Sequence, residues 1–330
     1  MKLRLCVIGC GDFVRTFAKS LASARDLVEL YFASRDYERA KSYSTEFGGA
    51  GAFGSYEDAA ADPRIQALYI CTPHHLHLEH TQIAANAKKH ILLEKPIART
   101  MAEARAIISA AIDAGVKLMI AENYRFLAPV QEAKRIIESG ALGRVRFIQL
   151  HEEYPFSPSS WRNDKELNGG GVMIDGGIHK ASVLAFLAGR PNQVYSVFVP
   201  PGIPGLEAED GIVATTRSPE GVVGIINHTW SIGKTTGRPW VSVSGTLASL
   251  RFEMGSSWLN IDYGKSQETR RFDGDSRGLI PMVLEFRRSI LEDSEPAMTG
   301  EEGLKDLAMV LKAYESARSG QPLEIDYLSA

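Results

Sequence analysis

The stretch Leu3–Gly11, LRLCVIGCG, decides the fold of the N-terminal part of this chain. It is a short apolar run that ends on glycine, and a helix-like segment follows it through Ala24. A strand that turns on glycine into a helix directs backbone N–H groups and the positive helix end toward one place, where a pyrophosphate can sit. The stretch therefore matches the dinucleotide-binding pattern G-x-G-x-x-G, except that Val14 replaces the third glycine and should push the helix slightly off the strand.

A second predicted strand, Val28–Ala33, bears on the choice of cofactor. At its end an NAD-preferring site carries an acid for the ribose hydroxyl, whereas this chain has Ser34 and Arg35. A hydroxyl and a guanidinium suit a 2′-phosphate better, so NADP(H) is favoured and NAD(H) is the alternative. In another interpretation Ser34 or Asp36 only caps the helix that runs to Phe47, and Arg35 is solvated.

Strand-like and helix-like segments continue to alternate up to Glu122. This alternation is typical of right-handed βαβ crossovers and a parallel sheet. We therefore predict an α/β chain whose residues 1–122 form a dinucleotide-binding Rossmann domain with a doubly wound parallel sheet. The further strands are expected at 51–53, 67–71, 91–93 and 117–121, and the helices at 56–61, 78–89 and 101–114.

Three loops follow strands of this predicted sheet: Thr72–His77, Glu94–Pro96 and Asn123–Arg125. In a doubly wound sheet the ligand lies beyond the carboxyl ends of the strands, so all three loops should open onto one crevice. Pro96 biases Lys95 toward an extended conformation. A lysine held at a strand end can donate a hydrogen bond to a reacting oxygen, although a solvated lysine is the commoner case.

The histidines after the fourth predicted strand raise the question of a metal site. His74, His75, His77 and His80 lie close together in the sequence, with Glu79 among them. A metal needs ligands that converge, and the consecutive His74 and His75 project in different directions. We therefore expect no metal site.

Residues 123–330 show a different pattern. A helix-like segment runs from Pro129 to Ser139, and a strand over 145–153 precedes a polar loop over 155–168. Turn-separated strands without intervening helices then indicate an antiparallel or mixed sheet. They are expected at 194–199, 212–217, 222–230, 240–244, 249–252, 258–261 and 268–272, before helices at 279–291 and 302–319. We predict an α+β domain over 123–330 with a large open, mostly antiparallel sheet, one face of which is free.

The stretch Gly169–His179, GGGVMIDGGIH, carries the strongest chemical signal. Its glycines let the backbone turn freely, or run close to another surface, before a helix starts. If that helix begins near Val172, Asp175 and His179 lie four residues apart on one face. A carboxylate beside an imidazole can move protons near neutral pH, although such a pair is more often a surface or capping contact.

The composition is that of an ordinary globular protein. The chain has 330 residues, 44% of them hydrophobic and 23% charged, with a formal net charge of −3. No basic excess indicates nucleic acid, and no segment approaches the roughly 20 apolar residues that span a bilayer. Cys6, Cys10 and Cys71 are few and odd in number, which favours reduced thiols. We expect a cytoplasmic protein that binds neither nucleic acid nor membranes.

Segments along nearly the whole chain resemble the Gfo/Idh/MocA family of NAD(P)-dependent oxidoreductases, which includes glucose-fructose oxidoreductase and inositol dehydrogenase. The matching segments are VIGCGDF, ASRDYERA, YICTPHHLHLEH, ILLEKPIA, AENYRF, SSWRNDKELNGGGVMIDGGIHKAS and EGLKDLAMVLKAYESARSGQPLEI. The combination of a glycine-rich turn, EKP and GGG-x(3)-D-x(3)-H makes the resemblance specific.

The resemblance implies roles for particular residues. Lys95 matches the lysine that contacts the reacting hydroxyl or carbonyl, and Asp175 and His179 match the acid and the imidazole of the active site. Substrate contacts are expected from Asn123, Tyr124, Trp161 and Arg162. The predicted cofactor contacts are Gly9, Gly11, Asp12, Phe13, Ser34, Arg35, Thr72, Pro73, His74, His77, Glu94 and Lys95.

The resemblance also implies an activity and an oligomer. The expected activity is NADP(H)-dependent hydride transfer between the nicotinamide and a secondary alcohol or ketone of a sugar, keto-sugar or cyclitol. Two alternatives are a non-catalytic NAD(P)-binding sensor of the galactose-repressor type and a glycosidase that retains NAD. The free face of the second sheet often makes the oligomer contact in the family, so we expect a homodimer or homotetramer.

Overall fold

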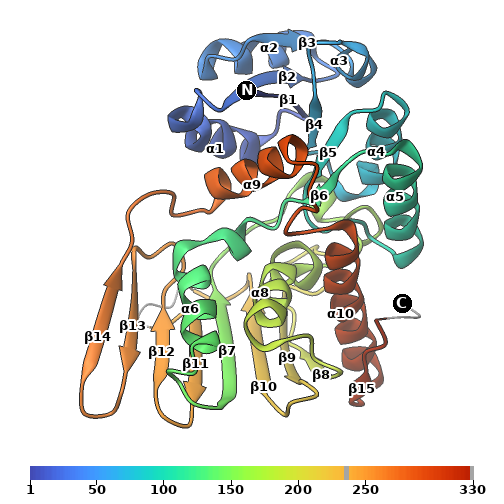
Figure 1. The fold of residues 1–330 in the computed structure, drawn as a ribbon. Helices are drawn as coiled ribbons and strands as arrows, with labels where there is room; N and C mark the ends of the chain where they lie inside the picture. Colours follow the sequence, from blue (N-terminus) through green and yellow to red (C-terminus); the bar gives the residue numbers. More distant parts are fainter. Residues whose placement is uncertain (234–237, 328–330) are drawn as a thin grey trace. The chain divides into compact units, whose positions relative to one another are not determined.

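A computed structural model describes residues 1–233 and 238–327 of the chain. The chain folds into two compact units. The first unit comprises Met1–Glu122 and Leu279–Leu304, and the second comprises Asn123–Gly278 and the residues from Lys305 onward. Each unit builds a sheet of its own (Figure 1).

The first unit is built on a six-stranded parallel sheet in the order β3-β2-β1-β4-β5-β6. Its strands are β1 (Leu3–Ile8), β2 (Val28–Ala33), β3 (Gly51–Phe53), β4 (Ala67–Ile70), β5 (His90–Leu93) and β6 (Leu118–Ile120). Its helices include α1 (Asp12–Ser20), α2 (Tyr37–Phe47), α3 (Tyr56–Ala61), α4 (His77–Asn86) and α5 (Met101–Ala114). Every residue of β4 is buried, as expected where helices cover both faces of a parallel sheet. The predicted doubly wound parallel sheet is confirmed.

The first compact unit also includes a segment from beyond residue 122, the predicted domain boundary. Helix α9 (Leu279–Leu291) belongs to the first unit, where it packs against α1. The segment after α9 extends the edge of the first sheet, because Thr299 pairs with Met119 of β6. An amphipathic sequence pattern predicts a helix, but it does not say on which core the apolar face packs.

The second unit contains a nine-stranded sheet in the order β14-β13-β12-β11-β7-β10-β9-β8-β15. Strands β7 and β10 run parallel, and the other paired strands are antiparallel. The strands are β7 (Val145–Glu153), β8 (Gln193–Phe198), β9 (Gly211–Arg217), β10 (Val223–Thr229), β11 (Val241–Gly245), β12 (Ser249–Phe252), β13 (Trp258–Asp262), β14 (Gln267–Arg271) and β15 (Leu323–Glu324). The predicted open, mostly antiparallel sheet is confirmed.

Helices cover one face of this second sheet (Figure 1). Helix α6 (Ala128–Glu138) packs on β13, and α8 (Ile178–Ala188) packs on β7 and β10. On β8, Tyr195 and Val197 are 42% and 44% exposed, whereas Val194 and Ser196, which alternate with them, are buried. This alternation is expected of a strand with one covered face. The unit also contains α7 (Lys165–Asn168) and most of α10 (Gly300–Ser319).

One helical run is long and apolar enough, by length and composition alone, to cross a membrane. The run is Lys165–Ala188, which includes α7 and α8. In its most apolar window, 83% of the residues are buried inside the protein. Buried side chains such as Val183 and Leu184 identify it as a core helix, because a lipid-facing helix would expose them.

Candidate functional site

The glycine-rich turn after β1 lies where the strand order of the first sheet reverses, between β1 and β4. Gly9 has a φ of +93°, and a Cβ on it would come within 2.9 Å of the Cys71 carbonyl oxygen. Gly11 caps α1 without a side-chain hydrogen bond, and a Cβ built on Gly11 would have no heavy atom within 4 Å. The start of α1 therefore has room and uncapped N–H groups, which fit a pyrophosphate.

The residues that open α1 divide between the surface and the core. Asp12 and Phe13 are exposed. Val14, which replaces the third glycine of the pattern, is buried. Its isopropyl group therefore packs inside the unit, and only Asp12 and Phe13 of the three are accessible to a ligand.

The end of β2 carries Ser34 and Arg35. The Ser34 hydroxyl accepts a hydrogen bond from the Asp36 N–H at 3.2 Å, and the Asp36 carboxylate accepts one from the Arg39 N–H at 3.2 Å. Asp36 is thus the N-cap of α2, as one interpretation of the sequence expected. The cap makes no use of the Arg35 guanidinium.

His77 ties the loop after β4 to the loop after β5. One ring nitrogen of His77 lies 3.1 Å from the Thr72 carbonyl oxygen, and the other lies 2.9 Å from the Pro96 carbonyl oxygen. Burial lowers the pKa of His77 to about 4, so the ring is neutral at neutral pH. A neutral imidazole has one N–H, so His77 donates to one of the two carbonyl oxygens at a time. Because its exposed fraction is 0%, His77 can serve the predicted cofactor site only by packing between these two loops.

The neighbouring residues of this loop are engaged with one another. Pro73 precedes a short 3-10 turn, and the His74 ring meets the His77 ring edge-on at 5.7 Å. The Thr72 hydroxyl lies 2.8 Å from Nδ1 of His80, and burial lowers the pKa of His80 to about 4. Within residues 1–233 and 238–327, no three His, Cys, Asp or Glu side chains are grouped so that they could hold a metal ion.

Glu94 and Lys95 follow β5. The Tyr69 hydroxyl of β4 donates a hydrogen bond to the Glu94 carboxylate. Burial raises the pKa of Glu94 to about 7, and the nearby Lys95 opposes this rise. The peptide bond between Lys95 and Pro96 is cis. Lys95 thus lies at the carboxyl end of the first sheet, beside an acid that titrates near neutral pH.

In the second unit, Asp175 lies in a π-helical turn, η5 (Met173–Gly177), directly before α8. Its carboxylate accepts a hydrogen bond from Nε of Arg162 at 2.9 Å, and its side chain is 9% exposed. Two predicted site residues are therefore in contact. The π turn itself was not predicted; single π turns inside helices occur frequently at functional sites.

His179 occupies the first turn of α8 and is 8% exposed. Its ring stacks on the ring of Tyr124, with centroids 3.8 Å apart and planes 15° apart. The Tyr124 ring in turn meets the Trp240 ring edge-on at 5.4 Å. The stacking fixes the plane of the imidazole, so a proton on either ring nitrogen has a defined direction.

The other two predicted substrate residues differ in their surroundings. The Arg162 guanidinium lies 4.4 Å from the centroid of the Trp161 ring, which places Trp161 next to the partner of Asp175. The Asn123 side-chain amide donates to the Arg277 carbonyl oxygen at 2.6 Å, and Asn123 is buried. Part of the Asn123 amide therefore serves the fold.

Three polar side chains behind His179 were not predicted. Lys180 donates hydrogen bonds to the Glu152 carboxylate and to the Gly176 carbonyl oxygen. Nδ1 of His228 lies 3.0 Å from the Glu152 carbonyl oxygen, and burial lowers the pKa of His228 to about 3. These residues come from α8, β7 and β10, so no local sequence pattern unites them; the only signal was the position of Lys180 beside His179.

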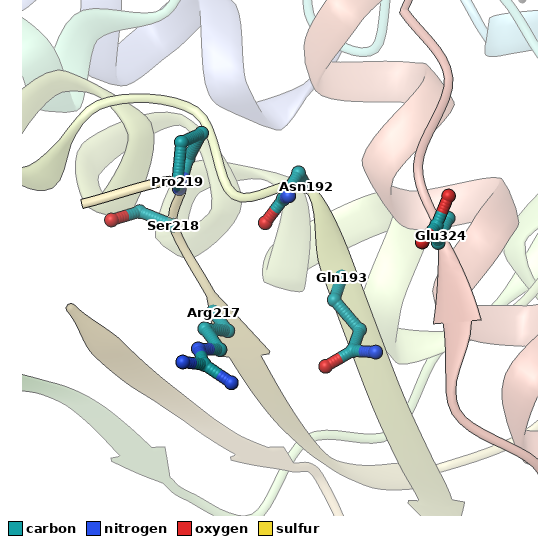
Figure 2. A pocket seen from close by; sticks show the side chains of 6 residues that line it. All are labelled: Asn192, Gln193, Arg217, Ser218, Pro219 and Glu324. Atoms are coloured by element: carbon teal, nitrogen blue, oxygen red, sulfur yellow. The ribbon is translucent and has the colours of Figure 1, made fainter. Parts of the chain in front are cut away.

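A surface pocket of about 280 Å³ lies elsewhere in the second unit (Figure 2). It is lined by Asn192, Gln193, Arg217, Ser218, Pro219 and Glu324. Arg217 pairs with Val223 at the start of β10, whereas His228 is near the end of β10. The pocket is therefore at the opposite end of the sheet from His228, and its lining residues, all of them described, include none of the predicted site residues.

Two family models match the chain and together cover most of it. Residues 3–122 match "Oxidoreductase family, NAD-binding Rossmann fold". Residues 130–251 match "GFO/IDH/MocA C-terminal domain". The two matches fall in the first and the second compact unit, respectively.

Similar proteins extend over nearly the full length. The 1,5-anhydro-D-fructose reductase of Ensifer adhaerens is 29% identical, over 97% of this chain and 98% of its own. D-xylose 1-dehydrogenase (NADP(+)) 2 of Haloferax volcanii is 29% identical, over 89% of this chain and 91% of its own. The solved structure of levoglucosan dehydrogenase in complex with NADH has a TM-score of 0.88 and 25% identity, over 99% of this chain and 100% of that chain. This chain belongs to the Gfo/Idh/MocA family of NAD(P)-binding oxidoreductases.

Proposed function

We propose that this oxidoreductase transfers a hydride between the nicotinamide of NADP(H) and a secondary alcohol or ketone of a sugar, keto-sugar or cyclitol. The observation that carries the proposal is the shielded imidazole of His179. His179 lies in the same helical segment as Asp175, and its ring stacks on the ring of Tyr124. Interconversion of an alcohol and a ketone needs a group that exchanges a proton near neutral pH, and an imidazole does so. Relatives named for anhydrofructose, xylose and levoglucosan support a carbohydrate substrate.

The residues that would hold the dinucleotide lie in the first unit. The uncapped N–H groups after Gly11 would bind the pyrophosphate, and residues 72–74 and 94–95 would border the cofactor site. Ser34 and Arg35 would bind the 2′-phosphate, which is the reason to prefer NADP(H). Similar proteins include an NADP(+) enzyme and one solved with NADH. The bound nicotinamide supplies the hydride chemistry.

The remaining chemistry is the handling of one proton and one developing charge. In the reducing direction His179 would give a proton to the alkoxide oxygen, and in oxidation it would take that proton back. Asp175 would orient the imidazole. Lys95 would donate a hydrogen bond to the same oxygen and stabilise its negative charge.

Trp161, Arg162 and Tyr124 would contact the substrate. Arg162 can donate hydrogen bonds to sugar hydroxyls while it holds Asp175, since a guanidinium has five N–H donors. Aromatic rings such as Trp161 line small-molecule sites because they give apolar contact area. Asn123 contributes less, because its amide already donates to a backbone carbonyl.

We further propose a homodimer or homotetramer that forms through the free face of the second sheet. The exposed Tyr195 and Val197 side chains on β8 support this, because large apolar side chains gathered on an uncovered sheet face indicate an interaction surface. Size-exclusion chromatography with light scattering tests the proposal, and a monomer at micromolar concentration would contradict it.

We also propose a cytoplasmic location for the protein. Its three free cysteines fit this location, because reduced thiols are usual in the cytoplasm.

A panel of polyols and keto-sugars, assayed in both directions with NADP(H) and NAD(H), tests the proposed function. We expect turnover of at least one member, with NADP(H) preferred. A chain that turns over none and instead binds another protein in a cofactor-dependent way would support the sensor alternative. Cofactor that stays bound through gel filtration, with product formed but no net oxidation or reduction, would support the glycosidase.

A further inference from the structure

The helix that carries Asp175 and His179 starts without a local cap. Val172 precedes the π turn, and it makes no side-chain hydrogen bond to the helix start. The first four N–H groups of any helix have no partner within that helix. Here they belong to residues 171–174, because the Asp175 N–H is the first one that bonds within the helix, to the Gly171 carbonyl oxygen.

The hydroxyl of Tyr314, on α10, satisfies two of these groups. It accepts hydrogen bonds from the Gly171 N–H at 3.1 Å and from the Ile174 N–H at 3.0 Å. The same hydroxyl donates to the Glu209 carboxylate at 2.6 Å. A phenolic hydroxyl has one proton and two lone pairs, so its hydrogen-bonding capacity is fully used at this helix start.

Glu209 satisfies the other two groups. Its backbone carbonyl oxygen accepts the Val172 N–H at 2.9 Å, and its carboxylate accepts the Met173 N–H at 3.0 Å. A carboxylate at this place also complements the positive end of the helix. Glu209 and Tyr314 together therefore form a complete cap from residues distant in the sequence.

Gly170 and Gly171 leave the space that the two capping residues occupy. A Cβ on Gly170 would lie 2.5 Å from the Tyr314 hydroxyl oxygen, and a Cβ on Gly171 would overlap the Glu209 carbonyl oxygen. The close approach that a glycine-rich turn permits is thus made by the protein's own side chain and backbone.

We propose that Tyr314 and Glu209 are positioning residues that set the direction in which Asp175 and His179 project. The inference rests on the proposed function of that pair. Asp175 follows the last capped residue, and its own N–H bonds to the Gly171 carbonyl oxygen at 3.2 Å, so a shift of the capped turn moves Asp175 directly. A misplacement of about 1 Å at an active site can cost about 100-fold in rate.

The test compares Tyr314→Phe with a matched control, Tyr327→Phe, in the full chain. Each change removes one hydroxyl from the second unit; that of Tyr327 donates to the Pro191 carbonyl oxygen at 2.8 Å. We expect Tyr314→Phe to lower kcat by about tenfold with the Kd for NADPH unchanged. Tyr327→Phe should retain the wild-type kcat. Equal kcat in both variants and the wild type, with similar losses of Tm, would overturn the inference.

A second pair of variants covers the case in which Tyr314→Phe does not fold. Glu209→Leu removes the carboxylate acceptor, whereas Glu209→Gln keeps an oxygen that can accept from Met173 and Tyr314. We expect about tenfold lower kcat for Glu209→Leu, and recovery of most of that loss in Glu209→Gln. No difference in kcat between Glu209→Leu and the wild type would also overturn the inference.

A readout without turnover separates this inference from the proposed function. If the wild type turns over no sugar or polyol, the proposed function fails by itself. The NMR resonances and titration of the His179 ring can still be compared in the wild type and in Tyr314→Phe. We expect both to change, with amide exchange at residues 171–174 at least about tenfold faster. A ring signal and titration identical to the wild type would show that the cap does not position His179.

Discussion

Each unit starts a candidate functional helix with a glycine-rich turn, and the two turns are used in opposite ways. At the start of α1 the Gly11 position is open, and no side chain caps the helix. At the start of the helix that carries Asp175, Tyr314 and Glu209 take all four free N–H groups. The first turn leaves room for an external anion, whereas the second is filled by the chain. Glycine before a helix therefore predicts a close approach, but not what approaches.

The largest effect should follow from removing the imidazole on the second turn. His179→Ala should lower kcat by about 100-fold or more, because proton transfer by a positioned side chain contributes that much. The Kd for NADPH should be nearly unchanged, because the residues proposed to bind the cofactor lie in the first unit and His179 lies in the second. Steady-state kinetics and a fluorescence titration measure the two quantities. Wild-type turnover would show that His179 is not the acid–base group.

The glycines themselves allow the comparison to be broken directly. Gly171→Ala should lower the free energy of unfolding by about 1–3 kcal/mol, because its Cβ would overlap the Glu209 carbonyl oxygen. Gly11→Ala should change it by less than about 0.5 kcal/mol, since that position is open and has an ordinary φ of −98°.

For cofactor binding, Gly11→Ala should have a larger effect than Gly171→Ala, which is the reverse of the order expected for stability. Gly11→Ala should raise the Kd for NADPH about tenfold, because its methyl group would occupy the space proposed for the pyrophosphate. Urea denaturation and calorimetric titration give the two quantities. If Gly11→Ala destabilises the fold as much as Gly171→Ala does, the first turn is filled by the chain as well.

Arg35→Ala tests whether the first unit prefers NADPH or NADH. Loss of the guanidinium should raise the Kd for NADPH by about tenfold and leave that for NADH nearly unchanged, because only NADPH carries the 2′-phosphate. Lys41→Ala is a suitable control, since Lys41 lies on α2 and pairs only weakly with Glu38, at 3.8 Å. Equal losses for both cofactors would remove the reason to prefer NADP(H).

The pH dependence of stability should distinguish two half-buried acids, Glu94 in the first unit and Glu209 in the second. Glu94 has a pKa of about 7 in the folded protein against an ordinary 4.5, so between these values the folded state holds more protons than the unfolded state. Its contribution to the free energy of unfolding is therefore present below about pH 4.5 and is lost as the pH rises to 7.

Glu94→Gln should remove this slope, which amounts to roughly 2–3 kcal/mol between pH 5 and 8. Burial also raises the pKa of Glu209, but hydrogen bonds from Tyr314 and Met173 oppose the rise, so Glu209→Gln should flatten the profile less. Urea denaturation across this pH range measures both. A larger change in the pH dependence from Glu209→Gln than from Glu94→Gln would show that Glu209, and not Glu94, is the acid with the more strongly raised pKa.

Much of the fold could be predicted because apolar runs and their spacing are local properties. The predicted strands Leu3–Ile8 and Val28–Ala33 and the helix Met101–Ala114 have the bounds found in the structure. The sequence does not indicate the core on which the apolar stripe of α9 packs, and α9 belongs to the first unit. The loop predicted over 155–168 contains the short helix α7, too short to show helical periodicity.

The candidate site was predictable only where chemistry and local spacing coincide. Asp175 and His179 could be found because both lie in one short stretch, and Arg162 because the family resemblance implies a substrate contact there. The cap could not, since Tyr314 lies 143 residues from Gly171, and Glu209 precedes a strand with no distinctive pattern. The last helix was predicted only as a helix over 302–319, and no periodicity reveals that one of its hydroxyls reaches a helix start.

The most direct measurement follows the hydride itself. The protein is incubated with a keto-sugar and with NADPH that carries deuterium on the transferable position of its nicotinamide, and the product is analysed by mass spectrometry. The proposed function predicts one deuterium on the carbon that becomes the secondary alcohol, at a rate that falls about 100-fold in His179→Ala. Product without deuterium, or no product from any member of the panel, would contradict it.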